Sequence, residues 1–354
     1  MSNKYVVNYK EYCREELIAH AQSRLSSDLS DWERDLFDFI LNWVSLSSTI
    51  SIHTSGSTGK PKEIQISKER MIRSAERTLR YFEVKPSESI LLCLPVKYIA
   101  GMMMVVRAFT GSLNLITLPP HQLQLGNIKG EIGFAALVPL QMDKLLNEHQ
   151  DIASIRKIIL GGSLVSPMLE EKLKGSFPGR IWETYGMTET ITHVAVREIN
   201  GAARIFNALP EISFSTDDRE CLIISDPGIL DEPLYTNDRV ELLSETSFRL
   251  LGRIDHVINS GGIKVQPEVL ESLIAPYILG RFCITSLPDE TLGEMIVLVV
   301  EKGVDLVRVR EGIDALESYH RPKKVFELEQ IPVNRNGKID YKELKDNIGQ
   351  LAGN

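Results

Sequence analysis

The sequence predicts an α/β protein with a large N-terminal domain, which carries an antiparallel β subdomain, and a small α+β C-terminal domain. From residue 48 to about residue 180, short apolar segments alternate with amphipathic ones, which is typical of α/β layers around a largely parallel sheet. Past about residue 200, helical patterns stop and short strand-like segments follow, which indicates an antiparallel subdomain. Beyond residue 254, helical and strand patterns return over a length typical of a small domain.

The individual elements follow from these patterns. The first 46 residues are expected to form two helices, the second opened by a capping box in which Ser30 and Glu33 each satisfy a backbone N–H. The expected strands of the layered part are Thr49–His53, Ile90–Leu94, Leu113–Leu118, Phe134–Val138 and Lys157–Leu160. Its helices are Lys68–Phe82, with Ser67 as N-cap, and Pro167–Phe177. The later expected elements are strands Glu211–Phe214, Cys221–Ser225 and Phe248–Leu251, helix Pro267–Ile274, strands Phe282–Ser286 and Glu294–Glu301, helix Val307–Tyr319 and strand Val325–Leu328.

Composition and charge exclude several classes of protein. The 354 residues carry a net charge of −8 without a basic run, which argues against nucleic acid as a partner. The N-terminus lacks the apolar core of a signal peptide, and the apolar run Met295–Val300 is too short to span a bilayer, so we expect a cytoplasmic protein without membrane insertion. The four cysteines follow no metal-binding spacing and the seven histidines do not cluster.

The strongest chemical signal is the segment Thr54–Lys62, with the sequence TSGSTGKPK. Glycines let the backbone turn tightly enough to aim N–H groups at phosphate oxygens, while hydroxyls and lysines add donors and charge. The segment is not a Walker A loop, because only two residues separate Gly56 from Gly59 and a proline follows Lys60. A polar turn without a binding role is the alternative.

Five motifs in chain order resemble those of the adenylate-forming superfamily, which includes acyl- and aryl-CoA ligases, peptide-synthetase adenylation domains and luciferases. They are Thr54–Lys62, Tyr185–Glu189, Tyr235–Asp238, Gly252–Asp255 with the adjoining Ser260–Glu268, and Pro332–Lys338. The resemblance implies an enzyme that uses ATP, Mg²⁺ and coenzyme A, activates a small carboxylic acid as an acyl-adenylate, and transfers the acyl group to the CoA thiol. A homodimer is left open.

The resemblance also implies a role for each motif residue. The ATP phosphates are expected to contact Thr54, Ser55, Gly56, Ser57, Thr58, Gly59 and Lys62. Adenine and ribose are expected to contact Gly161, Gly162, Ser163, Tyr185, Asp238 and Arg253. Thr188 would contact the adenylate phosphate and Glu189 would bind Mg²⁺, roles that suit a hydroxyl donor and a hard oxygen ligand.

The same resemblance implies a mobile small domain. We expect a large domain of residues 1–253 and a small domain of residues 254–354, which turns about a hinge near Asp255. Lys338 would be the catalytic lysine, placed to stabilise the charge that develops during attack on the α-phosphate. Gly261 and Gly262 would line the channel for the CoA thiol arm, where a side chain would obstruct.

The acid substrate is indicated by two further strings. LPVKYIAGMMMVVRAF and ETYGMTETITHVAV are most similar to o-succinylbenzoate–CoA ligases of menaquinone biosynthesis. That substrate has two carboxylates, so we expect Arg107 to bind the non-reacting one, aided by Lys97, Thr192 or His193. The residues expected to contact the acid are Tyr98, Arg107, Gly186, Met187 and His193. An ordinary ion-paired helix arginine is the alternative for Arg107.

The chain departs from the family pattern in three places. Asn237 stands where the family usually has glycine, and Tyr98 stands where many relatives carry histidine. About 50 residues precede the phosphate loop, fewer than is usual. This leaves open how the nucleotide end of CoA is held.

Three other functions stay open. A phenylacetate-type or other aryl-CoA ligase would share all five motifs. An amino-acid-adenylating enzyme needs an acidic residue in the segment Leu94–Gly101, which has none. A non-catalytic nucleotide-binding relative would be expected to lose the lysine or the metal carboxylate, whereas this chain keeps both Lys338 and Glu189.

Overall fold

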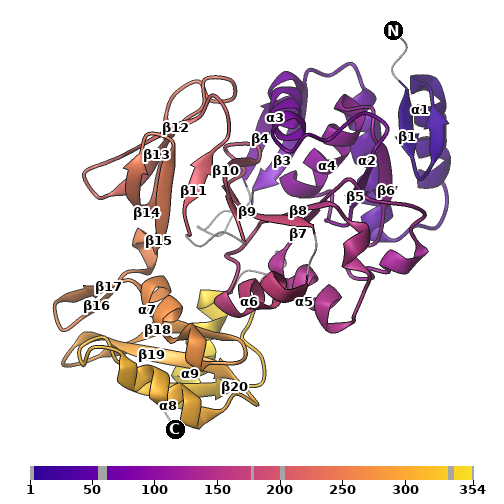
Figure 1. Ribbon diagram of the computed structural model, residues 1–354. Helices are drawn as coiled ribbons and strands as arrows, with labels where there is room; N and C mark the ends of the chain where they lie inside the picture. Colours follow the sequence, from indigo (N-terminus) through magenta and orange to yellow (C-terminus); the bar gives the residue numbers. More distant parts are fainter. Residues whose placement is uncertain (1–3, 55–61, 177–178, 200–203, 334–338, 353–354) are drawn as a thin grey trace.

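The computed structural model describes residues 4–54, 62–176, 179–199, 204–333 and 339–352 (Figure 1). These residues form a large lobe around one 13-stranded sheet, with a separate two-stranded β3–β4 ribbon, and a smaller lobe around a five-stranded sheet. The helices are α1 (Arg14–Leu25), α2 (Asp31–Val44), α3 (Lys68–Tyr81), α4 (Ile99–Thr110), α5 (Pro139–Asn147), α6 (Pro167–Ser176), α7 (Pro267–Ile274), α8 (Leu306–Ala315) and α9 (Tyr341–Ala352).

The strands of the large lobe fall in two groups. The first group comprises β1 (Tyr5–Val7), β2 (Lys10–Tyr12), β3 (Thr49–Thr54), β4 (Lys62–Ser67), β5 (Ser89–Leu92), β6 (Asn114–Thr117), β7 (Phe134–Leu137), β8 (Lys157–Leu160) and β9 (Arg180–Gly186). The second comprises β10 (His193–Glu198), β11 (Phe206–Ala208), β12 (Ser213–Thr216), β13 (Cys221–Ser225), β14 (Leu234–Ser244) and β15 (Ser247–Arg253). The small lobe contains β16 (Ile258–Ser260), β17 (Ile263–Val265), β18 (Phe282–Asp289), β19 (Gly293–Glu301) and β20 (Lys324–Leu328).

The centre of the large sheet is parallel, in the order β6-β5-β7-β8-β9. Its strands are short apolar runs because helices cover both faces. Side chains alternate between the faces: Ile90 and Leu92 join the core beneath α2–α4, whereas Leu91 joins the core beneath α5 and α6 (Figure 1). The predicted α/β layers are confirmed.

The antiparallel strands β10–β15 continue the same sheet, because β10 pairs with β9 in the antiparallel sense. Figure 1 shows them as an arm beside the α/β layers. The predicted antiparallel subdomain is therefore present and is joined to the parallel strands by hydrogen bonds.

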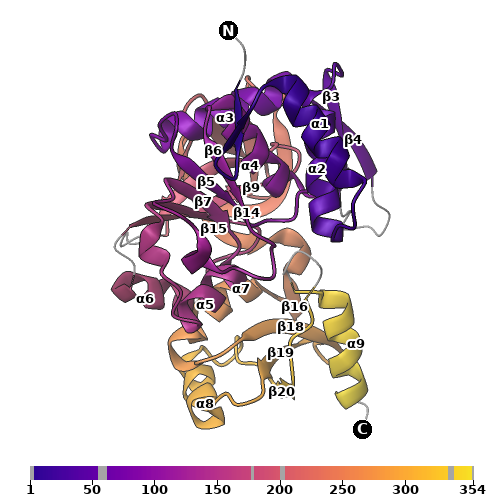
Figure 2. The same cartoon turned by 90° about the vertical axis from the view of Figure 1, so that its right-hand side faces the viewer.

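In the small lobe, helices cover both faces of the sheet. Ile284 of β18 packs in the core that includes α7 and α8, whereas its neighbour Cys283 packs in the core that includes α9. Figure 2 shows α8 and α9 on opposite sides of this sheet. The last strand of the large sheet ends at Arg253, and the first strand of the small sheet begins at Ile258.

Several expected elements were wrong in detail. The first residues form the β1–β2 hairpin, whose three-residue strands are too short to show a period. The capping box of α2 is present, but Ser67 makes no side-chain cap at α3. The strand expected at Glu211–Phe214 lies at Ser213–Thr216, because Glu211 has a positive φ of 71°. Missed elements include α5, α9, β9, β10 and the β16–β17 hairpin.

None of the helices in the described part of the chain is long and apolar enough to cross a membrane.

Glu271 gives the small lobe an expected dependence on pH. Glu271 lies on α7, and its carboxyl group accepts the N–H of Ile284 in β18 at 2.7 Å; burial raises its pKa to about 7. The folded state therefore holds a proton that the unfolded chain releases near pH 4.5. This contribution to stability is fully present below pH 4.5 and is lost as the pH rises to about 7.

Glu271→Gln keeps an oxygen acceptor for Ile284 but cannot ionise. We expect its free energy of unfolding, relative to the unmodified chain, to rise between pH 4.5 and 7 and then level off, by up to about 3 kcal/mol. Urea titrations at pH 5 and pH 8 measure this difference. Glu290→Gln, an exposed carboxylate, is the control. A difference that is the same at both pH values would contradict the assignment.

Candidate active site

Four of the expected site segments, all within the described residues, lie near the ends of strands of the large sheet. Strands β8 and β9 are parallel, so the β8–α6 loop (residues 161–166) and the Tyr185–Glu189 segment lie at the same edge of the sheet. Strand β14 supplies Asp238 from the antiparallel arm. The end of β15 supplies Arg253, which pairs with Asp238 in the ladder. The fold thus brings four segments that are distant in the sequence to one region.

Tyr185, Asp238 and Arg253 form a hydrogen-bonded chain. The Tyr185 hydroxyl donates to Asp238 Oδ2 at 2.6 Å, and Arg253 Nη1 donates to Asp238 Oδ1 at 3.2 Å. Burial and the Asp238 carboxylate raise the pKa of Tyr185 well above its usual value, so the hydroxyl stays a donor. Asp238 is thereby held as an oriented carboxylate, the group that two ribose hydroxyls need as acceptor.

The Tyr185 ring itself is largely covered. It packs edge-on against Phe248, with ring centroids 5.1 Å apart, and near Phe206. The sequence predicts a contact of Tyr185 with the adenine or ribose but gives no role for its hydroxyl. In the structure the hydroxyl orients a carboxylate of β14, with three strands between β9 and β14 in the order of the sheet, a contact that no local pattern reveals.

A second set of contacts holds Asp255, in the turn between the two sheets. Arg253 Nη2 donates to Asp255 Oδ2 at 2.6 Å, and Asn237 Nδ2 donates to Asp255 Oδ1 at 3.1 Å. Arg219 in turn contacts the Asn237 side-chain oxygen at 3.4 Å. The asparagine that departs from the family pattern therefore has a partner in the expected hinge residue.

The β8–α6 loop is anchored by its neighbour strand β9. Gly161 lies so close to Thr184 that a Cβ on residue 161 would be 2.6 Å from the threonine hydroxyl. Gly162 has a φ of +87°, which glycine adopts without strain. Ser163 follows and is exposed at the open side of the loop. Its hydroxyl is available to a ligand.

The Thr188–Thr192 segment is a strained turn. Ile191 has a φ of 63°, a left-handed conformation that costs a β-branched residue about 1–3 kcal/mol. The Thr190 hydroxyl holds the turn, since it donates to the Thr192 carbonyl at 2.7 Å and accepts the Met187 N–H at 3.0 Å. Sequence reasoning missed this strain, which lies beside the residues expected to contact the adenylate.

Glu189 is exposed at this turn, and no ion pair involves it among the described residues. A free carboxylate suits Mg²⁺, which takes few protein oxygens and completes its shell with phosphates and water. No cluster of three or more potential metal ligands exists in the described ranges. The donor set therefore fits a metal that arrives with a polyphosphate.

Arg107 and His193 are buried near each other, and His193 lies beside Gly186 of the Tyr185–Glu189 segment. His193 pairs with Gly186 in the β9–β10 ladder, and Arg107 lies in the last turn of α4 with 2% of its surface exposed. Burial and the positive charges of Arg107 and Arg77 keep the pKa of His193 well below its usual value. The ring is thus neutral beside a guanidinium.

Tyr98 does not lie beside Arg107. It precedes the first turn of α4, whereas Arg107 is in the last turn, so about 14 Å of helix separates their backbones. The Lys97 ammonium lies 5.5 Å from the Tyr98 ring centre, at the same end of the helix. The structure therefore places the expected acid-binding residues in two groups, one at each end of α4.

Gly261 and Gly262 form the two-residue turn of the β16–β17 hairpin. Their φ values are +60° and +83°, as in the turns that favour glycine pairs. A Cβ on Gly262 would meet no atom within 4 Å. The turn is therefore open to a neighbour.

Some expected site residues lie outside the described residues: Ser55, Gly56, Ser57, Thr58, Gly59 and Lys338. Thr54 and Lys62 are described by their backbone only, as the last residue of β3 and the first of β4.

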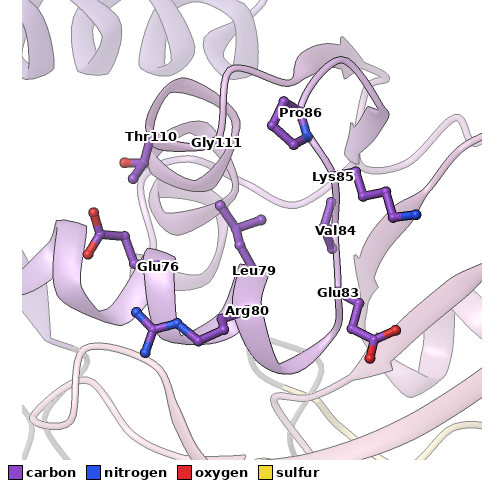
Figure 3. Close-up of a pocket in the computed structure, with 9 residues that line it drawn as sticks. All are labelled: Glu76, Leu79, Arg80, Glu83, Val84, Lys85, Pro86, Thr110 and Gly111. Carbon is purple, nitrogen blue, oxygen red and sulfur yellow. The ribbon is translucent and has the colours of Figure 1, made fainter.

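A surface hollow between α3 and α4 is separate from these residues. Figure 3 shows Glu76 and Arg80 at one side of it and Lys85 pointing away. The residues that line it are Glu76, Leu79, Arg80, Glu83, Val84, Lys85, Pro86, Thr110 and Gly111. None of the expected site residues is among them, so the hollow carries no part of the expected chemistry.

Comparison with known proteins defines the class. Residues 41–224 match the family model described as AMP-binding enzyme. The 2-succinylbenzoate–CoA ligase of Escherichia coli is 27% identical over 312 residues, which cover 83% of this chain and 67% of that protein. A solved acyl-CoA synthetase (AMP-forming)/AMP-acid ligase II-like protein from Dyadobacter fermentans is 30% identical with a TM-score of 0.60 and covers 91% of this chain and 95% of its own.

A further solved structure shares the fold. The o-succinylbenzoate–CoA synthetase of Bacillus subtilis, in complex with ATP and a magnesium ion, has a TM-score of 0.72 at 19% identity, over 98% of this chain and 84% of its own. The chain belongs to the AMP-binding enzyme family. The class predicted from the motifs, an AMP-forming acid–CoA ligase, is confirmed.

Proposed function

We propose that this chain is an AMP-forming ligase that adenylates o-succinylbenzoate and transfers the acyl group to coenzyme A. The observation that carries the choice of acid is the state of Arg107. Its guanidinium is buried, its Nε has no hydrogen-bond partner, and no ion pair involves it among the described residues. Within the described chain, the Arg107 Nη1 group donates a hydrogen bond to the Met104 sulfur at 3.4 Å.

A buried arginine without a carboxylate is costly. Burial lowers the pKa of Arg107 to about 9, so the group is still charged near neutral pH. Burying a charge without a partner costs several kcal/mol, and proteins pair such groups almost without exception. A carboxylate from a ligand would supply the missing partner and recover part of this cost on binding.

His193 supports the same choice. Its Nε2 is also buried, with no hydrogen-bond partner in the part of the chain that the structure describes. A neutral imidazole can donate one N–H to an anion, and it does not neutralise Arg107 by itself. Two unsatisfied nitrogen groups of neighbouring residues, joined to the Tyr185–Glu189 segment through Gly186, suit a planar carboxylate. An acid with a single carboxylate, which must react, would leave them unsatisfied.

The reaction would proceed in two steps. First, the reacting carboxylate oxygen of the acid attacks the α-phosphorus of ATP and pyrophosphate leaves. The Asp238 carboxylate, held by Tyr185 and Arg253, would accept the ribose hydroxyls. Glu189 would hold Mg²⁺, which offsets phosphate charge when bound. Lys338 would stabilise the charge that develops on the transferring group.

In the second step the CoA thiolate attacks the acyl carbon and AMP leaves. We propose that the small domain, from residue 254 onward, turns about Asp255 between the steps and brings Gly261 and Gly262 to the site. The open hairpin turn of these two glycines supports this role. Positioning of the substrates would supply most of the rate, since the nucleophiles belong to them.

The test is acid-dependent release of pyrophosphate with MgATP, with and without CoA. The acids are o-succinylbenzoate, benzoate, phenylacetate, acetate, a fatty acid and amino acids. We expect turnover with o-succinylbenzoate at a kcat/KM at least about 10²-fold above the monocarboxylates, since the latter leave Arg107 unpaired. Mass spectrometry should detect the CoA thioester as product.

Each other outcome selects one of the alternatives. Preference for phenylacetate or benzoate would keep the ligase class and exclude this acid. Turnover with amino acids would indicate an amino-acid-adenylating enzyme. No turnover by a folded chain that still binds ATP would favour a non-catalytic relative.

A further inference from the structure

The β8–α6 loop is fixed to strand β9 at both of its ends. At its start, the Thr184 hydroxyl donates to the Leu160 carbonyl at 3.0 Å. At its far end, the Val165 N–H donates to Glu183 Oε1 at 2.8 Å. The two anchors are consecutive residues of β9, and Tyr185 comes directly after them. The loop can therefore move little unless β9 moves with it.

The Glu183 carboxylate belongs to a cluster of four charges, of which three are buried and the fourth, Arg204, is partly exposed. Its Oε2 accepts a hydrogen bond from Arg197 Nε, and Arg197 also donates to Glu170 of α6 at 3.2 and 3.3 Å. Arg204 donates to Glu170 at 2.7 Å. The side chains of Glu183, Arg197 and Glu170 are 3%, 2% and 8% exposed. The cluster is balanced, with two positive and two negative groups.

Stability alone gives little reason for such a cluster. A buried ion pair loses hydration that its internal attraction only partly restores, and apolar residues of similar volume are often as stable or more stable. What the cluster provides is a fixed position for its carboxylates. Of the two, only Glu183 bonds directly to the β8–α6 loop in the described structure; Glu170 bonds to the two arginines, of which Arg204 makes a long contact of 3.5 Å with the Val165 carbonyl.

We propose that Glu183 is a positioning residue for nucleotide binding, whose carboxylate fixes the far end of the β8–α6 loop and so places Ser163 and the adjoining glycines at the nucleotide. This inference rests on the proposed function and on the contact of Gly161, Gly162 and Ser163 with adenine and ribose that the motifs predict. Arg197 holds the carboxylate in the orientation that receives the Val165 N–H. Glu183 does not touch the reacting groups.

The test compares two variants that remove the same charge from the cluster. Glu183→Leu and Glu170→Leu each leave it with one surplus positive charge, but only the first removes the acceptor of Val165. Glu183→Asp keeps the charge and withdraws the carboxylate by about 1.5 Å, the length of one carbon–carbon bond. AMP affinity is measured by calorimetry for each variant, and the free energy of unfolding by urea titration.

We expect Glu183→Leu and Glu183→Asp to weaken AMP binding by about 10-fold, the effect of one lost hydrogen bond of about 1.4 kcal/mol. Glu170→Leu should lose stability yet bind AMP as the unmodified chain does. Hydrogen exchange of the Val165 amide should rise in Glu183→Asp and not in Glu170→Leu. If Glu183→Leu does not fold, Glu183→Asp decides the question.

Two results would overturn the inference alone: AMP affinity unchanged in the Glu183 variants, or weakened equally in Glu170→Leu, which would assign the cluster to stability. If the unmodified chain failed to bind AMP, the proposed function would fail first, and the inference with it.

Discussion

Arg107→Met is expected to lower kcat/KM for o-succinylbenzoate by about 10²- to 10³-fold, because the variant leaves a substrate carboxylate without its cation in a buried site. Methionine keeps most of the length of the side chain, so the packing around α4 changes little. The free energy of unfolding should stay the same or rise, since the free protein loses a buried charge without a described partner. Steady-state kinetics and urea titration measure the two quantities.

A second substrate distinguishes loss of carboxylate binding from misfolding of the Arg107→Met variant. 4-Oxo-4-phenylbutanoate keeps the reacting acid and lacks the ring carboxylate, so Arg107→Met should leave its kcat/KM nearly unchanged. Arg80→Ala, at the surface hollow of Figure 3, is the control for loss of an arginine. Equal losses with both acids would mean that Arg107 supports the fold of the site and does not bind the ring carboxylate.

Lys338→Ala is expected to slow adenylation by about 10²-fold or more, the scale of losing a preorganised electrostatic donor. Thioester formation from supplied acyl-adenylate and CoA should be largely spared, because the charge that Lys338 would stabilise belongs to the first step. Single-turnover assays of the two half-reactions measure these rates separately. Lys324→Ala, an exposed lysine at the start of β20 and outside the motifs, is the control. Equal losses in both half-reactions would exclude the assigned role.

The layered part of the fold could be predicted because its local signals agree. Strand β8 and helix α7 have the bounds that the sequence indicated, since an apolar run of three residues after Lys157 and a proline at the first helical turn leave little choice. The hairpin β1–β2 could not be predicted, because its strands are defined by pairing, β1 with β6 across more than 100 residues of chain.

The site divides in the same way. Motifs gave Tyr185, Asp238 and Arg253 as members of one site, and the structure brings them into contact. The partners of Glu183 could not be predicted, since Arg197 and Val165 come from two other segments. A lack of partners is equally invisible in a sequence. Arg107 can be recognised as unpaired only when every neighbour has been placed.

Arg253 forms hydrogen bonds to two carboxylates at once, Asp238 at 3.2 Å and Asp255 at 2.6 Å. Asp238 would bind the ribose, and Asp255 lies at the expected hinge. The Arg253 guanidinium would therefore take part both in nucleotide binding and in the rotation of the small domain. A nucleotide that takes the Asp238 carboxylate changes the charge around Arg253, and with it the strength of the bond to Asp255. Thermodynamic linkage makes the effect reciprocal: the factor by which the nucleotide shifts the hinge is the factor by which the hinge shifts nucleotide affinity. Allosteric coupling between site and hinge would then need no relay through the core, only a guanidinium that both share.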